Sequence, residues 1–275
     1  MYATRGDDFD STTCFGEYEM GQKLGEGGFG NVFLATHRQT GEKYAIKIIK
    51  TENIGSVSDI DNIFVEAEIL KSLNHENIVK VHNCLTLKNM EVAIIMEFLE
   101  GGELLKYVEK TKEGRLDERT AQSFFRQIVR GMKYCHSSNL LHRDLKLENV
   151  LLVNSQEQKI KIIDFGIAGA INLLSKDNLD TGSLNYMAPE CFTNHKDYKV
   201  DGRIDVWSTG VILYCMLNGQ LPFKAPNNYE TIEAIKHGSY HLVPGVKETL
   251  SAQCLEVLRL CLEVNPKKRI TMEDL

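Results

Sequence analysis

The chain has 275 residues, 43% of them hydrophobic and 25% charged, and its formal net charge is -6. This is an ordinary globular composition, long enough for one large domain or two lobes, and the acidic balance argues against general nucleic-acid binding. The seven cysteines are scattered without metal-site spacing, which suits a reducing compartment, so we expect a cytoplasmic protein, with the nucleus as the alternative. We expect no signal peptide and no membrane span, because no apolar run is long enough.

The first part of the chain has mainly strand-like patterns. Residues 1–14 are polar, and we expect a flexible segment there. Strand-like patterns follow from Tyr18 to about Leu99, with a hairpin turn at 39–43. One helix interrupts them, with apolar residues at helical spacing and Ser58 as its expected N-cap. We therefore expect a small β-rich lobe over about residues 15–99.

Helical patterns dominate from about residue 100 to the end. A long helix is expected from a cap at Asp117 through Ser138, and shorter helices near 204–218, 228–237 and 248–262. Two short strands are expected at 150–153 and 159–164. The last residues resemble a helix that has just begun, so we expect the natural protein to continue. The fold class is therefore α+β, with a second, larger and mainly helical lobe over about residues 100–275.

The first motif is the glycine-rich stretch GEGGFGNV. Glycine lets the backbone approach a phosphate closely. The same spacing also occurs in dinucleotide-binding folds, where a helix follows, and in plain glycine-rich hairpins. Here a strand-like segment follows, and Lys47 lies in a strand 17 positions after Gly30. This arrangement favours a flap over a nucleotide triphosphate, although a plain hairpin stays open on this motif alone.

A strand lysine that faces phosphates needs a carboxylate to fix it. The expected helix offers Glu66 and Glu68, which point in different directions because they are two residues apart. Glu66 shares the face of Ile63 and Leu70, which points inward, so Glu66 is the expected partner and Glu68 is expected to be solvated. The alternative is that Glu66 is an ordinary surface charge.

The stretch NLLHRDLKLENVLL places a tight group of polar residues in an apolar setting. Asp144 could accept a hydroxyl proton, and Lys146 could neutralise charge on a transferring phosphoryl group. Asn149, together with Asp164 in DFG, offers hard oxygens that suit magnesium better than zinc. A buried ion cluster is the alternative for the first motif alone, but the spacing of both motifs favours phosphoryl transfer.

In this order, GEGGFGNV, YAIK, HRDLKLEN, DFG and APE resemble the signature of eukaryotic protein kinases over residues 15–275. The resemblance implies a two-lobed kinase fold, with a small antiparallel β-sheet lobe that has one main helix and a larger, mainly α-helical lobe. It implies transfer of the γ-phosphate of ATP to protein hydroxyls, with Mg2+ or Mn2+ as the metal. Lys47 paired with Glu66, Asp144 and Lys146 would be catalytic.

The resemblance also implies a set of cofactor-binding positions. Asn149 and Asp164 would hold the metal. The nucleotide would be bound by the glycine-rich lid, the adenine pocket and the segment between the lobes: Leu24, Gly25, Glu26, Gly27, Gly28, Phe29, Gly30, Val32, Ala45, Lys47, Met96, Glu97, Leu99, Glu103 and Leu151. Structural positions match as well, namely a buried column, a buried ion pair and an aspartate that braces the HRD backbone: Leu70, His142 and Phe165; Glu190 with Arg269; and Asp205.

Lys146 and Ser183 resemble the serine/threonine kinases, and the stretches GGELLKYV and LKLENVLL are most similar to the calcium/calmodulin-dependent kinase group, especially its AMP-activated-kinase-like branch. Glu103 and Glu148 match acidic positions of basophilic kinases, which implies basic residues upstream of the acceptor. Cys215 stands where some of these kinases carry a second glutamate, so that preference is expected to be incomplete. The alternative is that both glutamates are solvated.

One departure concerns the activation loop. Leu179 stands where related kinases often carry a phosphorylatable threonine, and Arg143 needs an anion. That anion could come from an aspartate or from a phosphorylated hydroxyl: Asp177, Asp180, Thr181 or Ser175. Besides protein substrates and ATP, an upstream kinase or a regulatory C-terminal segment is therefore an expected partner. A pseudokinase scaffold is the competing function, but the chain retains Lys47, Asp144 and Asp164.

Overall fold

The computed structural model describes residues 16–27, 30–49, 57–87, 91–165, 183–192 and 201–275, with side chains of the first helix described from Ile63 onward except at positions 64 and 66. The chain divides into two compact units. The N-terminal unit contains residues up to 71 together with 80–98, and the C-terminal unit contains 72–79 together with 99–275. Each unit is described by itself.

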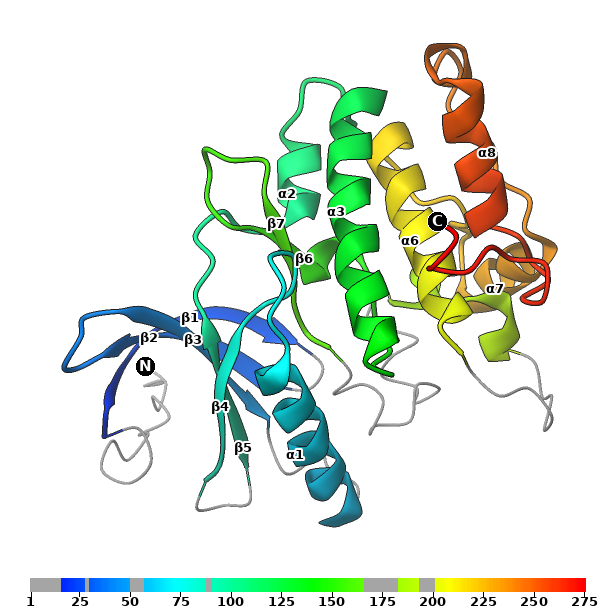
Figure 1. Cartoon of the computed structure of the whole chain (residues 1–275). Helices are drawn as coiled ribbons and strands as arrows, with labels where there is room; N and C mark the ends of the chain where they lie inside the picture. Colours follow the sequence, from blue (N-terminus) through cyan, green and yellow to red (C-terminus); the bar gives the residue numbers. More distant parts are fainter. Residues whose placement is uncertain (1–15, 28–29, 50–56, 88–90, 166–182, 193–200) are drawn as a thin grey trace, which may run out of the picture. The chain divides into compact units, whose positions relative to one another are not determined.

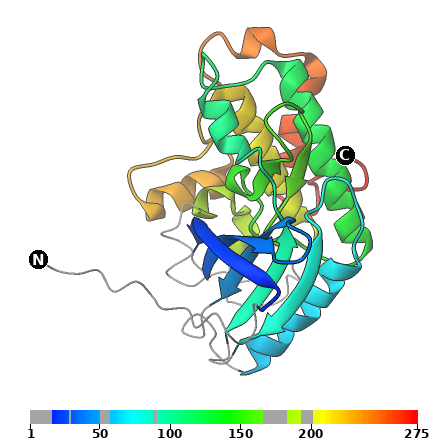
Figure 2. The same ribbon diagram turned by 90° about the vertical axis from the view of Figure 1, so that its left-hand side faces the viewer.

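The N-terminal unit is a five-stranded antiparallel sheet with one helix beside it (Figures 1 and 2). The strands are arranged in the order β1-β2-β3-β5-β4. Their bounds are β1 Tyr18–Gly27, β2 Gly30–His37, β3 Lys43–Ile49, β4 Val81–Thr86 and β5 Val92–Glu97. The expected hairpin turn joins β2 to β3, where Gly41 adopts a φ of 73° and its N–H donates to the carbonyl of His37. Glycine adopts this left-handed conformation without steric cost.

The two faces of this sheet carry different side chains. One face holds a small apolar core, to which the inner three strands β2, β3 and β5 contribute fully buried residues: Ala35, Ile46, Ile48, Ala93 and Ile95. Partly buried apolar side chains pack around this core, among them Tyr18 and Phe33. Because side chains alternate along a strand, the residues between these core positions point to the other face.

Helix α1 spans Val57–Ser72 and begins one residue before the expected cap. The prediction that Ser58 caps it is therefore wrong, because Ser58 lies within the first turn. Propensity signals locate helix ends only to within a few residues. The predicted apolar spacing is confirmed where side chains are described, since Ile63, Ala67 and Leu70 are buried.

The C-terminal unit is mainly helical. Its helices are α2 Leu104–Glu109, α3 Glu118–Ser137, α6 Arg203–Asn218, α7 Asn228–His237 and α8 Ala252–Cys261, and its short strands are β6 Val150–Leu152 and β7 Ile160–Ile162. Single 3-10 turns lie at Leu147–Asn149, Ser183–Tyr186, Pro189–Phe192 and Lys247–Thr249. Every residue of α6 from Ile204 to Asn218 is buried, so this helix is the centre of the unit, and α3 and α8 pack against it (Figure 1).

Helix α3 confirms the sequence prediction at both ends. The Asp117 carboxylate accepts a hydrogen bond from the Thr120 N–H at 3.0 Å, and Ser138 follows the last helical residue as the C-cap. This N-cap satisfies one of the backbone N–H groups that a helix leaves unpaired in its first turn. Phe125, Ile128 and other predicted apolar residues are buried against the unit's core.

The unit boundary differs from the expected lobe boundary in one segment. Residues 72–79 precede β4 in sequence but belong to the C-terminal unit. The backbone of Asn77 and Val79 exchanges hydrogen bonds with Ile162 of β7, and the Asn77 side-chain amide donates to the Ile160 carbonyl at 3.0 Å. These bonds, which join residues far apart in sequence, hold the segment there.

The last residues also differ from expectation. Residues 271–275 form a turn rather than the start of a helix. The Thr271 hydroxyl bonds the Asp274 carboxylate at 2.5 Å and accepts from the Asp274 N–H at 3.2 Å, which closes the turn locally. None of the helices in the described part of the chain is both long and apolar enough to cross a membrane.

Candidate active site

Strand register places the predicted nucleotide-binding residues of the N-terminal unit on one face of the sheet. Val32 lies opposite Lys47, and Ala45 lies opposite Met96. Directly opposed residues of antiparallel strands point to the same side, and so do residues two apart along a strand. Val32, Ala45, Lys47 and Met96 therefore share the face that is opposite the small apolar core. Lys47 is 4% exposed, which is unusual for a lysine without a functional or structural role.

Two glycines of the lid, Gly30 and Gly25, differ in how much room a side chain would have. A Cβ at Gly30 would lie 2.0 Å from the Ile48 carbonyl oxygen, so the sheet itself requires glycine there. At Gly25, by contrast, nothing lies within 4 Å of an added Cβ. Gly25 pairs with Val32, and Gly27 pairs with Gly30. Packing therefore explains Gly30, whereas none of the described residues requires glycine at position 25.

Several predicted positions fall outside what the structure describes. These are Gly28 and Phe29 at the tip of the lid, and the side chain of Glu66, so its pairing with Lys47 stays a prediction. Glu68, expected to be solvated, is exposed and lies 3.7 Å from Lys71. Leu24 is exposed on β1, and Glu26 pairs with Lys23 at 2.6 Å.

The last residue of β5 and the segment that follows it contain the other expected adenine positions. The Glu97 carboxylate accepts from the Lys80 N–H at 2.7 Å, and its own N–H donates to the Lys80 carbonyl. Leu99 is buried and is the first residue of this segment in the C-terminal unit. Glu103 forms an isolated antiparallel bridge with Leu151.

In the C-terminal unit, a buried carboxylate fixes the backbone of the HRD loop. Asp205 is fully buried on α6, and its two oxygens accept from the N–H groups of His142 and Arg143 at 2.9 and 2.8 Å. His136 of α3 contacts the same carboxylate at 2.8 Å. Burial alone would raise the pKa of Asp205, but the hydrogen bond and charge of His136, together with His142, lower it. An ionised Asp205 therefore braces this loop from below.

The loop brings the predicted catalytic residues together. Lys146 lies 3.0 Å from the Asp144 carboxylate, and its Nζ donates to the Ser183 hydroxyl at 2.8 Å. The Asn149 side-chain amide donates to the Asp144 backbone carbonyl at 2.8 Å and to its carboxylate at 3.3 Å. Asp144, Lys146 and Asn149 thus form one hydrogen-bonded group, in which the carboxylate is held but still partly exposed.

Backbone strain marks the same region. Arg143 and Asp164 adopt φ angles of 67° and 59°, a left-handed conformation that side-chain-bearing residues rarely use. Such strain costs of the order of 1–3 kcal/mol per residue and concentrates at functional sites. His142 contacts the two residues that flank Asp164. Its imidazole lies 2.9 Å from the Ile163 carbonyl, and its ring lies 4.7 Å from that of Phe165.

The oxygen donors of this loop fit a magnesium ion. Because the Asn149 amide nitrogen is engaged by Asp144, its side-chain oxygen is the atom that can face a cation. The Ile163 N–H donates to the Asn149 carbonyl at 2.9 Å, which places Asp164 next in line. The described residues contain no cluster of three or more His, Cys, Asp or Glu side chains that could hold a metal. One asparagine and one aspartate suffice for magnesium, which keeps waters and phosphate oxygens as its other ligands.

Glu148 of this loop and Glu103 are close enough for their charges to interact. Burial raises the pKa of Glu148, and the negative charges of Asp144 and Glu103 raise it further, against the attraction of Lys146. One Glu148 oxygen is buried with no hydrogen-bond partner among the described residues. Such an oxygen is costly to bury unless a ligand supplies a donor. Cys215 is buried nearby, and burial raises the pKa of its thiol to about 12, so it adds no negative charge.

A second orphan atom belongs to Arg143. Its Nε is buried, and the described part of the chain offers it no acceptor. The positions expected to supply an anion, residues 175–181, lie outside the described residues. Their pairing with Arg143 stays a prediction.

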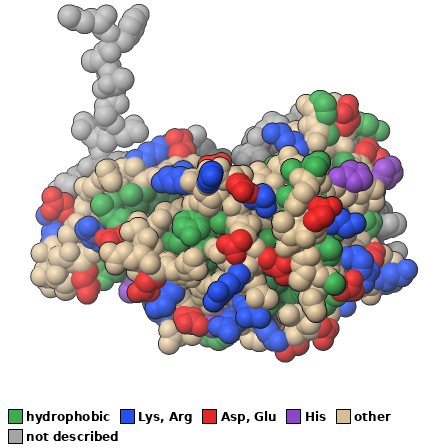
Figure 3. Space-filling model, turned by 90° about the horizontal axis from the view of Figure 1, so that it is seen from above, with side chains coloured by type: hydrophobic (Ala, Val, Ile, Leu, Met, Phe, Trp, Pro, Cys, Tyr) green, Lys and Arg blue, Asp and Glu red, His purple; other side chains and the backbone are tan. Residues whose placement is uncertain are grey.

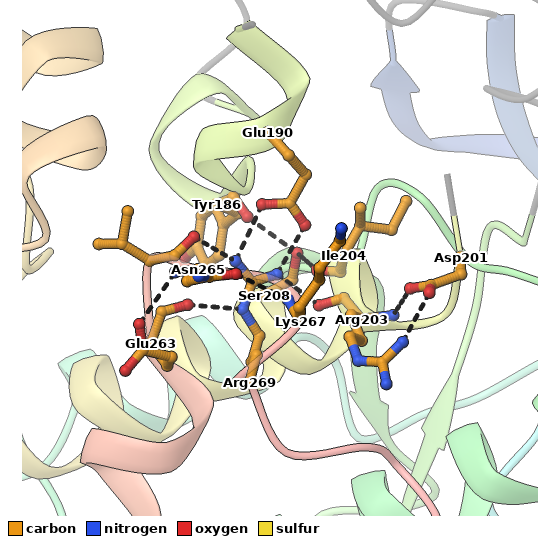
Figure 4. Close-up of polar contacts among 11 residues, drawn as sticks. Tyr186, Glu190, Asp201, Arg203, Ile204, Ser208, Glu263, Asn265, Lys267 and Arg269 are labelled. Atoms are coloured by element: carbon orange, nitrogen blue, oxygen red, sulfur yellow. Dashed lines mark hydrogen bonds and ion pairs between the residues drawn. The ribbon is translucent and has the colours of Figure 1, made fainter. Parts of the chain in front are cut away.

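The predicted buried ion pair is present (Figure 4). Arg269 and Glu190 form two parallel hydrogen bonds of 2.7 and 2.9 Å, and both side chains are almost fully buried. Arg269 also donates to the carbonyls of Glu263 and Arg203, and its guanidinium lies over the Trp207 ring. The pair ties the APE segment to the end of the chain.

Sequence reasoning missed His136. It contacts Asp205 from a position 69 residues away, on a helix face that also carries ordinary polar residues. The sequence held no local signal for it, because the contact depends on how α3 and α6 pack. Gly202 permits that contact, since an added Cβ would lie 2.6 Å from the His136 ring.

Comparisons with known proteins agree with one another. The family model described as "Protein kinase domain" matches residues 18–275. CBL-interacting protein kinase 17 of Oryza sativa subsp. japonica is 40% identical over 261 residues, which cover 94% of this chain and 55% of the relative. A crystal structure of Rad53 1-466 in complex with AMP-PNP is similar with a TM-score of 0.78 and 30% identity, covering 94% of this chain and 63% of that one. The chain thus spans just over half the length of the rice relative.

Proposed function

The chain belongs to the protein kinase family, and on that premise we propose that it transfers the γ-phosphate of ATP to serine or threonine hydroxyls of proteins. The observation that carries the proposal is the group formed by Asp144, Lys146 and Asn149 on a loop braced by Asp205. Phosphoryl transfer depends mainly on positioning and charge neutralisation, and this loop provides both.

Each residue of the group has a distinct task in the proposal. Asp144 orients the acceptor hydroxyl and takes its proton, which a carboxylate in hydrogen-bond reach can do. Lys146, 3.0 Å from that carboxylate, offers positive charge to the transferred group. Asn149 and Asp164 would hold Mg2+, which when bound neutralises charge on the phosphates. In the N-terminal unit, Lys47 and the lid would bind the phosphates of ATP.

A protein hydroxyl as acceptor is supported by Ser183. Lys146 donates to its hydroxyl at 2.8 Å, so the lysine is fixed between Asp144 and the segment that follows the activation loop. The rice relative is named as a protein kinase and the solved neighbour was crystallised with AMP-PNP, an ATP analogue. Both similarities support ATP as the phosphoryl donor here.

The direct experiment is transfer of labelled γ-phosphate to a peptide library, followed by identification of the phosphorylated amino acid. We expect phosphoserine and phosphothreonine, and near-complete loss in Asp144→Asn. Glu157→Gln is the matched control, because it makes the same acid-to-amide change at an exposed turn. Equal activity of Asp144→Asn and Glu157→Gln, with both variants folded, would refute the assignment.

We propose further that the substrate carries a basic residue upstream of its acceptor. The buried Glu148 oxygen, which has no partner among the described residues, and the nearby charge of Glu103 support this, because a guanidinium would donate to Glu148 and be attracted by both carboxylates. Glu103 already pairs with Lys106 at 2.8 Å at the surface, so Glu148 is the main contact. Cys215 stands where some basophilic kinases carry a second glutamate. Because its thiol is neutral, this chain has no negative charge at that position. We expect Glu148→Gln to lower kcat/KM about tenfold for a peptide with upstream arginine, by loss of a charged hydrogen bond, and to leave an alanine peptide unchanged. An equal loss for both peptides would contradict the preference.

We propose that Arg143 binds an anion of the activation loop, supplied by a phosphate that an upstream kinase adds or by an aspartate at 177 or 180. The buried Arg143 Nε, for which the described residues offer no acceptor, supports the need for such an anion. A regulatory C-terminal segment and a cytoplasmic location are also proposed, the latter supported by free thiols such as Cys84 and Cys191. Phosphatase treatment that leaves activity intact would favour the aspartates.

A further inference from the structure

The solvent-facing side of α3 carries a single line of basic side chains. Arg119, Arg126, Arg130 and Lys133 follow one another at intervals of seven, four and three residues. With 3.6 residues per turn, these positions fall on one face of the helix, and with 1.5 Å per residue they span about 21 Å. The three arginines are exposed and Lys133 is half-buried. We call these four residues the basic stripe.

The stripe is poorly neutralised by its own chain. The described residues provide one ion pair for Lys133 but none for Arg119, Arg126 or Arg130, and the only acid in α3 is Glu118. Glu118 is engaged elsewhere, since its carboxylate accepts from the Ser251 N–H at 2.6 Å. Figure 3 shows one face of the molecule, on which acidic and basic side chains are interspersed.

The neighbouring strand adds to the positive charge. Strand β7, which packs against α3, carries Lys161. Burial lowers the pKa of His75, Glu76 opposes this, and the charges of Arg130 and Lys161 lower that pKa further. A local excess of positive charge in a chain whose net charge is -6 is not a consequence of composition. It marks a surface that would attract an acidic partner.

A cavity of ≈ 350 Å³ opens where the stripe ends. Its lining includes Lys133 and His136 of α3, Arg203 at the start of α6, and Glu273 of the last turn. Lys133 donates to the Glu273 backbone carbonyl at 2.8 Å and lies 3.0 Å from its carboxylate, which is itself exposed. The chain thus already shows a carboxylate bound at the last base of the stripe.

We propose that the basic stripe and the cavity at its end bind an acidic polypeptide segment of a protein partner. Aspartate or glutamate side chains of that segment would pair with the three arginines. A further carboxylate of the segment would replace Glu273 as the partner of Lys133. A protein segment fits better than a membrane, because none of the exposed large apolar residues, Leu24, Val65, Tyr229 and Val243, lies on α3 to insert into lipid. The net charge of -6 argues against nucleic acid.

The test is binding of a fluorescent peptide of ten glutamates to the full 275-residue chain, measured by anisotropy. We expect Arg126→Glu/Arg130→Glu to weaken binding at least about tenfold, since two attractive pairs become repulsive. The matched control is Lys247→Glu/Lys268→Glu, which changes the net charge equally at exposed lysines outside the stripe. We expect the control to retain binding within about threefold, because these two lysines are not on α3 and leave all four bases of the stripe in place.

A gain-of-binding variant makes the test independent of damage to the fold. Glu273→Gln removes the competing carboxylate from Lys133, so it should tighten binding about two- to threefold. Absence of binding by the wild type, equal losses in both double variants, or weaker binding of Glu273→Gln would each overturn the proposal. Stronger retention of the chain by phosphatidylserine vesicles than by the peptide, again lost in Arg126→Glu/Arg130→Glu, would reassign the stripe to membranes.

Discussion

The two units position their functional side chains by different means. In the C-terminal unit, buried charged groups fix the backbone: Asp205 holds the HRD loop and Arg269 holds the APE segment. In the N-terminal unit, strand register alone places Val32 and Lys47 on one face of the sheet. A buried charge that loses its partner is strongly destabilising, whereas register is shared among many backbone bonds. The two units should therefore respond differently to single substitutions.

Arg269→Ala should have the largest effect on stability. It leaves the buried Glu190 carboxylate without its two hydrogen bonds from Arg269, which costs about 3–5 kcal/mol of unfolding free energy. Urea unfolding at neutral pH measures this. Arg259→Ala is the control, because that arginine forms an exposed pair with Glu256, and its loss should leave the urea midpoint unchanged. Similar midpoints for both variants would remove the distinction between the two units.

The Asp205 brace should be visible in the pH dependence of stability. The folded-state pKa of Asp205 is lower than its ordinary value of 3.8. Its contribution is therefore complete above that value and is lost as the pH falls through the lower, folded pKa. We expect the unfolding free energy of the wild type to fall more steeply than that of Asp205→Asn below about pH 4. Parallel curves would show that Asp205 is not ionised in the fold.

The glycine lid sharpens the comparison within the N-terminal unit. Gly30→Ala places a Cβ 2.0 Å from the Ile48 carbonyl, so β2 and β3 must move apart. We expect a loss of about 1–3 kcal/mol, as for other overpacked sites. Gly25→Ala meets nothing within 4 Å and should leave stability unchanged while raising the KM for ATP. Thermal melting and steady-state kinetics of the two variants separate packing from ligand contact.

The smallest stability effect is expected at the N-cap of α3. Asp117→Ala removes the acceptor of the Thr120 N–H and should cost about 0.5–2 kcal/mol. Asp117→Ser keeps an acceptor and should recover most of that loss. If both variants unfold at the same urea concentration, the cap contributes nothing measurable.

Local patterns predicted most of the secondary structure. The Asp117 cap, the apolar face of α3 and the strands of the sheet follow from neighbouring residues, so they were visible in the sequence. Ser58 was misassigned because cap signals locate helix ends only within a few residues. The turn at 271–275 was mistaken for a helix, because Thr271 closes it with its own side-chain bonds.

Residues of the site were predictable where they belong to a motif and unpredictable where they act through packing. Asp144, Lys146 and Asn149 were found by spacing and lie together as expected. His136 and the attachment of residues 72–79 to β7 depend on contacts between distant segments. The strain at Arg143 and Asp164 also had no sequence signal, since side-chain-bearing residues rarely adopt positive φ.

The most direct test of the account is the single-turnover rate of phosphoryl transfer in Asp205→Asn, measured beside its affinity for ATP. The Asp205 carboxylate accepts two charge-assisted hydrogen bonds from the backbone of the HRD loop. The neutral asparagine weakens these bonds, so it should slow phosphoryl transfer about 10- to 100-fold. ATP affinity should stay within about twofold, because register in the N-terminal unit is untouched. A transfer rate equal to that of the wild type would contradict the claim that a buried carboxylate positions the catalytic loop.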